Sequence, residues 1–343
     1  MRILITGGCG FVGSNLAIFL KKNLKKSQII SLDNLFRKGS EVNQKRLKAY
    51  NVKNHKIDVK DYNKIAKLKK VDLVIDCCAE PSIEASGKDP DRLINTNLVG
   101  TYNLLKKCVA DKASIIFLST SRVYSIKNLR NLVKFHNIKN KININFEINE
   151  NFETSLPKSL YGSSKLCSED LIKEFNYSND VKYIINRFGV ISGPWQFGKQ
   201  DQGFVTLWLS RYLNKKKLSY IGFGGHGNQV RDIIHIDDVC AIILKQIQKF
   251  SKIKDELFNI GGGLKNALSL KELNEKCKII TKNSVRLAKV NKTSIYDVPY
   301  YVSDNTKIKK FYKWAPKKNI ETILNDINNW LISNKFLLKK YFK

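Results

Sequence analysis

The feature that most constrains the fold is a glycine-rich segment directly after a short apolar run. The run is Ile3-Leu4-Ile5, and the segment is Thr6-Gly7-Gly8-Cys9-Gly10-Phe11-Val12-Gly13. A short continuous apolar run is typical of a buried parallel strand. The glycines are spaced Gly-x-Gly-x-x-Gly, which permits a tight turn and lets a pyrophosphate approach the backbone closely. The segment therefore predicts a strand, a turn and a helix that together cradle a dinucleotide.

The helix expected after this turn carries apolar residues at roughly helical spacing: Phe11, Val12, Leu16, Ala17, Phe19 and Leu20. Its N-terminus would offer unpaired N–H groups and the positive end of the helix dipole to a phosphate. The alternative interpretation is a glycine-rich turn that binds nothing.

A carboxylate after the next expected strand bears on the identity of the dinucleotide. The strand Ile29-Ile30-Ser31-Leu32 ends at Asp33, twenty residues past Gly13. A carboxylate there can accept hydrogen bonds from the adenosine ribose and would repel a 2′-phosphate, so NAD is favoured over NADP. Arg37 and Lys38 follow closely, and they either pair with a 2′-phosphate or lie in a solvated loop.

A second short motif, Tyr161-Gly162-Ser163-Ser164-Lys165, indicates the chemistry. Its Tyr and Lys are four residues apart, so on a helix they share one face. The ordinary pKa of tyrosine is too high for a base at neutral pH, but a nearby ammonium and an oxidised nicotinamide would favour the phenolate. Tyr161 could then take a proton from a hydroxyl while hydride leaves the same carbon. The alternative is a surface Tyr and Lys on an ordinary helix.

The length and composition fit a globular protein. The chain has 343 residues, 43% of them hydrophobic, which suffices for one large or two modest domains. It has no apolar run long enough for a membrane span, and its N-terminus resembles a strand rather than a signal peptide. Seven cysteines without framework spacing agree with a reducing compartment, so we expect a cytoplasmic protein. The cysteines and the four histidines show no metal-ligand spacing, and no metal is expected.

The charge is strongly positive, with 61 Lys and Arg against 30 Asp and Glu, for a net charge of +31. Nucleic-acid binding is one interpretation of such a charge. The basic residues are scattered, however, as in Lys21-Lys22 and Lys215-Lys216-Lys217, and they form no single basic arm. We therefore expect no dedicated nucleic-acid partner, although a basic surface would help to steer an anionic substrate.

Strand-like and helix-like segments alternate through the first half of the chain. The further strand-like segments are Val52–Asp58, Val71–Cys78 and Ser114–Ser119, and the clearest helical stretch is Arg92–Ala110. This alternation predicts an α/β fold, a Rossmann-type doubly wound parallel sheet with helices on both faces. The adjacent Cys77 and Cys78 are expected in the core of this sheet.

Two regions depart from the alternation. Residues 125–155 are rich in Asn, Lys and Ile without a clear period, which predicts a long insertion. Beyond about residue 188 turns become denser, which predicts a smaller C-terminal α/β domain for substrate binding. We expect the NAD-binding domain over residues 1–188 plus about 232–258, and the substrate-binding domain over about 189–231 plus 259–343.

Over nearly its whole length the sequence resembles the extended short-chain dehydrogenase/reductase family, and within it the nucleotide-sugar epimerases. Besides the glycine segment, the resemblance rests on Asp33-Asn34-Leu35, Asp58-Val59, Asn97–Leu105, Ser119–Tyr124, Tyr161–Lys165 and Gln229–His235. Within the epimerases it is most similar to the CDP-paratose/CDP-tyvelose 2-epimerase branch, on Gln196–Gly203 and Gly227–Asp232.

The resemblance implies roles for the matching residues. The catalytic residues are Thr120, Tyr161 and Lys165. The cofactor-binding residues are Gly7, Gly10, Phe11, Val12, Gly13, Asp33, Asn34, Arg37, Asp58, Val59, Cys78, Ala79, Asn97, Tyr161 and Lys165. The substrate-binding residues are Arg122, Gln196, Gln202, Gly203 and Arg231. In this scheme Thr120 bridges the sugar oxygen and Tyr161, and Arg231 clamps the diphosphate with two parallel hydrogen bonds. For Thr120 the alternative is a strand-end residue that caps a turn.

Two positions separate the possible reactions. The related 4,6-dehydratases carry Asp-Glu directly after the catalytic Ser or Thr, whereas this chain has Ser121-Arg122. Dehydration is therefore disfavoured, because no carboxyl general acid is present there. Arg122 either reaches the substrate or makes a local salt bridge. Glu80, in Cys78-Ala79-Glu80, departs from the small polar residue that is more usual in the family.

The resemblance implies an enzyme, an NAD-dependent nucleotide-sugar epimerase of polysaccharide biosynthesis that acts through transient oxidation to a keto-sugar. A CDP-paratose 2-epimerase is the leading interpretation, and we expect a CDP-sugar rather than a UDP-sugar, and a homo-oligomer. One alternative is a UDP-sugar 4-epimerase. Another is a non-catalytic NAD- or RNA-binding regulator, which the charge favours and the presence of all three catalytic residues opposes.

Overall fold

The structure is a computed structural model that describes residues 1–82, 85–136, 146–198 and 202–342. The chain forms two compact units. Unit 1 comprises Met1–Thr120, Leu160–Arg187 and Cys240–Phe258, and unit 2 comprises Ser121–Ser159, Phe188–Val239 and Asn259–Lys343. Because the chain passes between the units several times, each unit is assembled from segments that are distant in the sequence.

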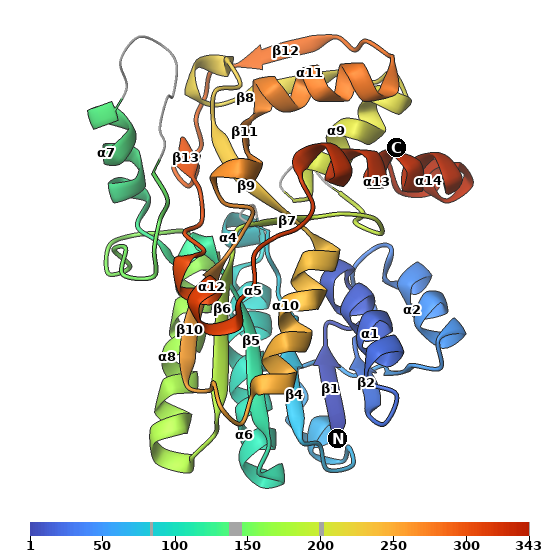
Figure 1. Cartoon of the computed structure of the whole chain (residues 1–343), viewed down its shortest axis with the longest axis vertical. Coiled ribbons are helices and arrows are strands. Elements are labelled where there is room, and N and C mark those ends of the chain that lie inside the picture. Colours follow the sequence, from blue (N-terminus) through green and yellow to red (C-terminus); the bar gives the residue numbers. More distant parts are fainter. Residues whose placement is uncertain (83–84, 137–145, 199–201, 343) are drawn as a thin grey trace. The chain divides into compact units, whose positions relative to one another are not determined.

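The centre of unit 1 is a parallel seven-stranded sheet with the order β10-β6-β5-β4-β1-β2-β3 (Figure 1). The strands are β1 (Arg2–Thr6), β2 (Gln28–Leu32), β3 (Lys53–His55), β4 (Leu73–Asp76), β5 (Ser114–Thr120), β6 (Tyr183–Phe188) and β10 (Glu256–Ile260). In β1, Ile3 is paired with Ile29 of β2 on one side and with Leu73 of β4 on the other. This is the doubly wound order with a seventh strand, so the predicted fold class is confirmed.

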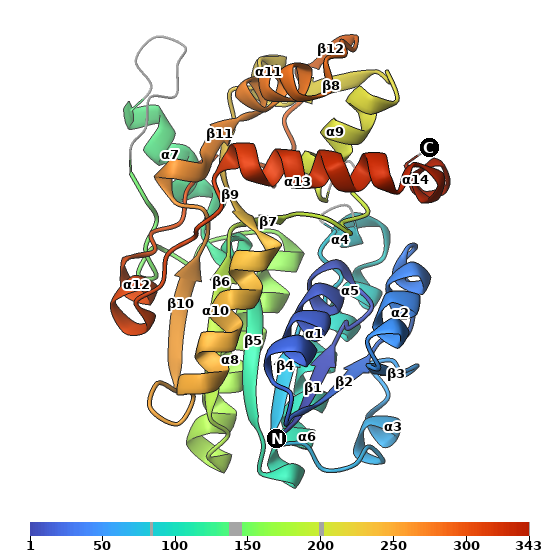
Figure 2. The same cartoon turned by 45° about the vertical axis from the view of Figure 1, so that its right-hand side comes forward.

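Helices cover both faces of this sheet, with α1 and α10 on one face and α6 and α8 on the other (Figures 1 and 2). The helices are α1 (Phe11–Asn23), α2 (Ser40–Ala49), α3 (Tyr62–Ala66), α4 (Ala85–Lys88), α5 (Pro90–Ile94), α6 (Gly100–Asp111), α8 (Leu160–Asn179) and α10 (Ile236–Lys249). Leu104 and Leu105 of α6 and Ile172 of α8 join the strand residues in one buried apolar cluster. Burial of these side chains stabilises the sheet.

The stretch Arg92–Ala110, expected as one helix, is divided in the structure. It contains the end of α5, a π-helical turn η1 (Asn95–Val99) and most of α6. A π turn contains one extra residue and changes the face that the following helix presents. Gly100 follows the turn, and a Cβ there would lie 2.7 Å from a methyl group of Val59. The glycine therefore allows close packing at the start of α6.

Unit 2 contains a four-stranded sheet and a separate two-stranded one. Its strands are β7 (Val190–Ser192), β8 (Leu218–Ile221), β9 (Val230–His235), β11 (Ala267–Ser269), β12 (Leu287–Val290) and β13 (Tyr300–Tyr301). Its helices are α7 (Ile126–His136), α9 (Phe204–Leu213), α11 (Leu270–Thr281), α12 (Thr306–Tyr312), α13 (Ile320–Ser333) and α14 (Lys335–Tyr341), with single 3-10 turns η2 (Ser121–Val123), η3 (Phe223–Gly225) and η4 (Leu264–Asn266). The core of unit 2 includes Trp208, Leu324 and Trp330.

The predicted insertion at 125–155 begins with a helix, α7, which the sequence analysis did not predict. Its apolar residues Ile126, Leu129 and Val133 are at helical spacing but stand among many Lys and Asn. Residues 137–145 lie outside the described part. After them, Ile148 forms a bridge with Ser303, and its N–H donates to the carbonyl of Val302 at 2.7 Å.

The two units differ from the sequence-based division in two segments, 121–159 and 232–239, which both belong to unit 2. The first leaves the sheet after β5 and pairs with the chain near residue 303, and the second continues from β9. Among the described residues, no helix combines the length and the apolar character needed to cross a bilayer.

Candidate functional site

The glycine segment forms a compact turn between β1 and α1. Gly7 has a φ of 58°, a left-handed conformation that favours glycine, and its carbonyl accepts the N–H of Gly10 at 2.9 Å. A Cβ at Gly13 would lie 2.3 Å from the carbonyl oxygen of Gly7. A side chain at Gly13 would therefore clash with the backbone of the turn, so this close approach of α1 to the turn requires glycine.

The N-terminus of α1 lies at this turn. Gly10 is the N-cap residue and provides no side-chain acceptor, and the first turn of the helix has no acidic residue. Such an N-terminus presents N–H groups and a positive dipole end to an anion. The cradle therefore fits the pyrophosphate of a dinucleotide.

Asp33 lies at the end of β2 beside the cradle. Its carboxylate accepts the N–H of Cys9 at 3.0 Å and the N–H of Leu35 at 2.7 Å. Burial raises the pKa of Asp33, and these two hydrogen bonds oppose the rise. The carboxylate is thus held against the turn, as the predicted contact with the ribose requires.

The structure brings a second pair of predicted cofactor residues together, because the Asn34 amide donates to Asp58 at 2.9 Å. Val59 is buried beneath Gly100. Cys78 and Ala79 follow β4 and are half-buried, and Arg37 is half-buried in the loop after β2. Burial raises the pKa of the Cys77 and Cys78 thiols, which keeps them protonated.

Lys165 is almost completely enclosed, with 1% of its surface exposed. Its ammonium lies 3.7 Å from the centre of the Phe117 ring, an approach that allows a cation–π interaction. Burial lowers the pKa of Lys165, while the carboxylates of Asp76 and Glu169 act in the opposite direction. This cation is therefore fixed in a dry environment where its charge acts strongly on its neighbours.

The other two predicted catalytic residues also lie in unit 1. Thr120 is the last residue of β5 and is buried. Tyr161 lies in the first turn of α8 and is half-buried, and Lys165 follows one turn later on the same helix. The structure thus places the hydroxyl of Thr120 at the carboxyl edge of the sheet, where ligands bind in doubly wound folds.

A buried network built around Asn97 supports this arrangement. The Asn97 amide donates to Ser164 Oγ at 3.0 Å, and Ser164 in turn donates to the carbonyl of Tyr161 at 2.9 Å. The Asn97 carbonyl accepts from Thr101 and from Ser168 at 2.8 and 3.0 Å. Asn97 lies in the π turn that precedes α6. Its direct role in the structure is to fix the start of α8.

Three further residues beneath Lys165 were not predicted from the sequence. Arg187 binds Glu169 through Nη2 at 2.7 Å, and Ser119 donates to the same carboxylate at 2.5 Å. Glu169 is completely buried, so its charge must be paired in this way. Ser119 immediately precedes Thr120, and the network therefore joins β5 to α8, the two elements that carry the predicted catalytic residues. The spacing of Lys165 and Glu169, four residues apart, was the available sequence signal.

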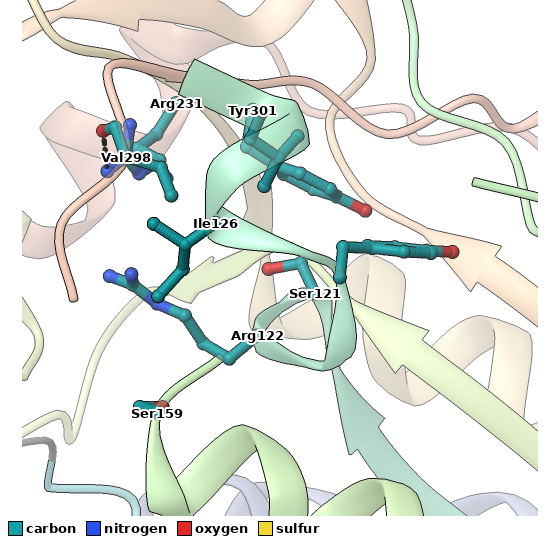
Figure 3. Close-up of a pocket in the computed structure, with 9 residues that line it drawn as sticks. Ser121, Arg122, Ile126, Ser159, Arg231, Val298 and Tyr301 are labelled. Atoms are coloured by element: carbon teal, nitrogen blue, oxygen red, sulfur yellow. Dashed lines mark hydrogen bonds between the residues drawn. The ribbon is translucent and has the colours of Figure 1, made fainter. Parts of the chain in front are cut away.

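Unit 2 contains its own pocket, drawn in Figure 3. It is lined by Ser121, Arg122, Tyr124, Ile126, Leu129, Ser159, Arg231, Val298 and Tyr301. Two predicted substrate residues, Arg122 and Arg231, are thereby brought together. Ser159 and Tyr301 were not predicted, because no motif marks them, and Ser121 was noted only as a departure from the dehydratases.

The two arginines of this pocket are held by one loop. Arg231 donates to Asp297 Oδ1 at 3.0 Å and to the carbonyl of Val298 at 2.6 Å, and Arg122 donates to the carbonyl of Tyr296 at 3.1 Å. Burial lowers the pKa of Arg231 to about 10; the charge of Asp297 opposes the shift and that of Arg122 adds to it. Two cations close to each other in a pocket favour an anionic ligand.

The remaining predicted substrate residues lie in another part of unit 2. Gln196 Oε1 accepts the hydroxyls of Ser192 and Thr206 at 3.0 and 2.9 Å, so this side chain fastens its own loop. Gly203 has a φ of 68° and packs against Gln196. Gln202 has a buried Oε1 that accepts no hydrogen bond within the described ranges. The pocket of Figure 3 includes none of these three residues.

Comparison with known proteins agrees with this picture. The profile of the family described as "Epimerase: NAD dependent epimerase/dehydratase family" matches residues 3–261. The chain is 28% identical to CDP-paratose 2-epimerase of Salmonella typhi, over 97% of this chain and 100% of that protein. It is 30% identical to a putative UDP-glucose 4-epimerase of Methanocaldococcus jannaschii, over 97% and 99%. The crystal structure of Thermotoga maritima UDP-glucose 4-epimerase with UDP-glucose has a TM-score of 0.81 at 27% identity, covering 98% of this chain and 100% of that one.

The fold and the cradle define the class, a Rossmann-type dinucleotide-binding enzyme. The chain belongs to the NAD-dependent epimerase/dehydratase family, as the sequence indicated, and its cofactor is NAD. The predicted resemblance to the extended short-chain dehydrogenases and the predicted cofactor are confirmed.

Proposed function

We propose that this protein is a nucleotide-sugar epimerase in which unit 1 holds NAD and unit 2 holds the sugar nucleotide. The observation that carries the proposal is the residue pair after Thr120. Ser121 and Arg122 both line the pocket of unit 2, and Arg122 places a cation where a dehydratase would need a carboxyl acid. Epimerisation requires no such acid, because no water is eliminated.

The proposed chemistry begins with proton removal by Tyr161. Lys165, as a buried cation one helical turn away, favours the phenolate of Tyr161 and so makes it a base near neutral pH. Thr120 would share the proton of the reacting hydroxyl through its own hydroxyl group. Bound NAD supplies a hydride acceptor that can return the hydride to the same carbon. Tyr161 then gives its proton back to the sugar oxygen, so no group of the chain is consumed.

The positive charge of the pocket supports a diphosphate-bearing substrate. Arg231 can replace its bonds to the loop by two parallel bonds to phosphate oxygens, and Arg122 adds a second cation. A CDP-sugar such as CDP-paratose is our leading candidate, since the full-length relative from Salmonella typhi carries that name. UDP-sugars are the second candidate, supported by the putative 4-epimerase from Methanocaldococcus jannaschii.

The test is to incubate the purified protein with CDP-paratose, UDP-glucose or dTDP-glucose in deuterated buffer and to identify products by NMR. An epimerase that works by hydride return gives an inverted carbon that keeps the hydrogen of the substrate. A 4,6-dehydratase gives a product that has lost water. Inversion of CDP-paratose at position 2 is the expected result. Loss of water from dTDP-glucose, or no turnover of any sugar with NAD bound, would contradict the proposal.

A further inference from the structure

The cradle of unit 1 is flanked by two loops. In the sheet β1 lies between β4 and β2, so the loop after β2 and the loop after β4 stand on opposite sides of the glycine turn. Neighbouring strands are spaced about 4.8 Å apart, which separates β2 from β4 by roughly 10 Å. A side-chain contact that joins these two loops must therefore extend across the cradle.

Arg92 of α5 makes such a contact. Its guanidinium carbon lies 4.8 Å from the centre of the Phe36 ring in the loop after β2. Its Nη2 lies 3.4 Å from Glu80 Oε2 in the loop after β4. We call Phe36, Glu80 and Arg92 the clasp.

The two ends of the clasp are held in place by the loops themselves. Leu35 has a φ of 62°, a strained conformation for a leucine, and the N–H of Phe36 donates to Asn34 Oδ1 at 3.0 Å. At the other end the Asn97 amide binds the backbone of Glu80 twice, at 2.8 and 3.2 Å. The strain and the hydrogen bonds direct Phe36 and Glu80 toward the same arginine.

The middle of the clasp is anchored through Asp89, the N-cap residue of α5. The backbone N–H of Arg92 donates to Asp89 Oδ1 at 3.1 Å, and the guanidinium Nε of Arg92 lies 3.2 Å from Asp89 Oδ2. Arg92 Nε is nevertheless buried and makes no aligned hydrogen bond to any described residue. Phe36 is 66% exposed, so a bound molecule can still reach its ring. Both observations fit a contact that completes itself around a ligand.

We propose that the clasp retains bound NAD by closing over the cradle between the loops after β2 and β4. An epimerase of the proposed kind returns the hydride to its own substrate, so it gains from holding one NAD through many turnovers. This inference rests on the NAD-binding role of unit 1 and adds a residue set that the glycine motif does not contain. Glu80, which departs from the usual residue, then has a role in retention.

The experiment measures how fast the full-length protein binds and releases NADH, followed by its fluorescence in a stopped-flow instrument with excess NAD as the chase. The variants are Phe36→Ala and Arg92→Met. Opening the clasp should raise the dissociation rate roughly 3- to 20-fold, the range expected for a lost cation–π contact and ion pair. The association rate should rise as well, since a closed clasp also slows entry.

Lys22→Met is the matched control. Lys22 lies 4.8 Å from the centre of the Tyr50 ring, the same distance as in the clasp, but it lies near the opposite end of α1 from the cradle. Its removal should leave both rates unchanged. Arg92→Lys should restore part of the retention, because the ammonium can still pair with Glu80.

The outcomes are separable. Unchanged NADH dissociation in both Phe36→Ala and Arg92→Met would overturn the clasp. A faster dissociation with an unchanged association rate would also overturn it and would assign Arg92 a direct contact with the dinucleotide. Phe36 is exposed, so Phe36→Ala should keep the melting temperature of the NAD-free protein and remains informative if Arg92→Met unfolds. Failure of the parent protein to bind NADH would contradict the NAD-binding role itself.

Discussion

The two units hold their functional cations in different ways. In unit 1 the ammonium of Lys165 is buried above a carboxylate, Glu169, that is itself paired with Arg187. In unit 2, Arg122 donates to the carbonyl of Tyr296, and Arg231 donates to the carbonyl of Val298 and pairs with the carboxylate of Asp297 at 3.0 Å. The cation of unit 1 therefore lies in a buried network of side chains, whereas the two guanidinium groups of unit 2 are oriented by one loop.

The same contrast extends to the loops. Arg130 of α7 donates to the carbonyls of Ser294, Ile295 and Asp297 at 2.8–3.2 Å, so a third arginine shapes this loop without lining the pocket. In unit 1 the start of α8 is held by a hydrogen bond between two side chains, the Asn97 amide and the Ser164 hydroxyl. Such a network of side chains resists rearrangement. An arginine bound to loop carbonyls can instead replace these hydrogen bonds by hydrogen bonds to a ligand.

The largest effect is expected at Tyr161, where we propose that the chemistry takes place. Tyr161→Phe removes the proton acceptor but keeps the ring, so turnover should fall by roughly 10²- to 10⁴-fold while NAD affinity changes little. Tyr177→Phe is the matched control, since Tyr177 is on the same helix and 90% exposed. Near-parental turnover of Tyr161→Phe would show that another group is the base.

A buried acid in unit 2, Asp232, should make the stability of the folded protein depend on pH. Burial raises the pKa of Asp232 to about 6 from an ordinary value of 3.8. Between these values the folded protein binds more protons than the unfolded chain, so Asp232 opposes folding increasingly as pH rises from about 4 to about 6. Relative to the parent, Asp232→Asn should gain about 3 kcal/mol in the free energy of unfolding over this range. A pH-independent difference in urea titrations would contradict this.

A smaller effect is expected from Asp33, the carboxylate that we predict to select the dinucleotide. The parent should bind NAD more tightly than NADP, and Asp33→Asn should reduce that preference by roughly 10- to 100-fold, the value of a hydrogen bond to a charged group. Asp58→Asn is the control and should affect both dinucleotides alike. Both dissociation constants are to be measured at physiological salt. Equal or tighter binding of NADP by the parent would mean that Arg37 and Lys38 dominate.

The smallest effect concerns the pocket of unit 2. Arg231→Lys keeps the charge but loses the two parallel donors, so KM should rise about tenfold with little change in kcat. Arg130→Lys is the control, because Arg130 contacts the same loop outside the pocket. An equal rise in KM for both variants would indicate a general effect of the loop.

The contrast between the units also explains what the sequence could predict. The cradle and the pair Tyr161 and Lys165 are each contiguous, because turns and helix faces are specified by neighbouring residues. The pocket of unit 2 joins Arg122, Ser159, Arg231 and Tyr301, whose proximity depends on long-range pairing of strands. No local pattern contains that information. Helix α7 was missed for a related reason, since its short apolar stripe is stabilised by packing rather than by propensity.

The π turn between α5 and α6 changes the phase of the helical repeat. One added residue rotates everything after it by about 100° around the helix axis. Without the π turn, one uninterrupted helical repeat would extend from Arg92 to Leu105. The direction of the Arg92 side chain would then fix the direction of the Leu105 side chain. With the π turn, α5 can direct Arg92 toward the loops around the cradle while α6 directs Leu105 into the core. Removing one residue from Asn95–Val99 should therefore turn α5 or α6 away from its present contacts.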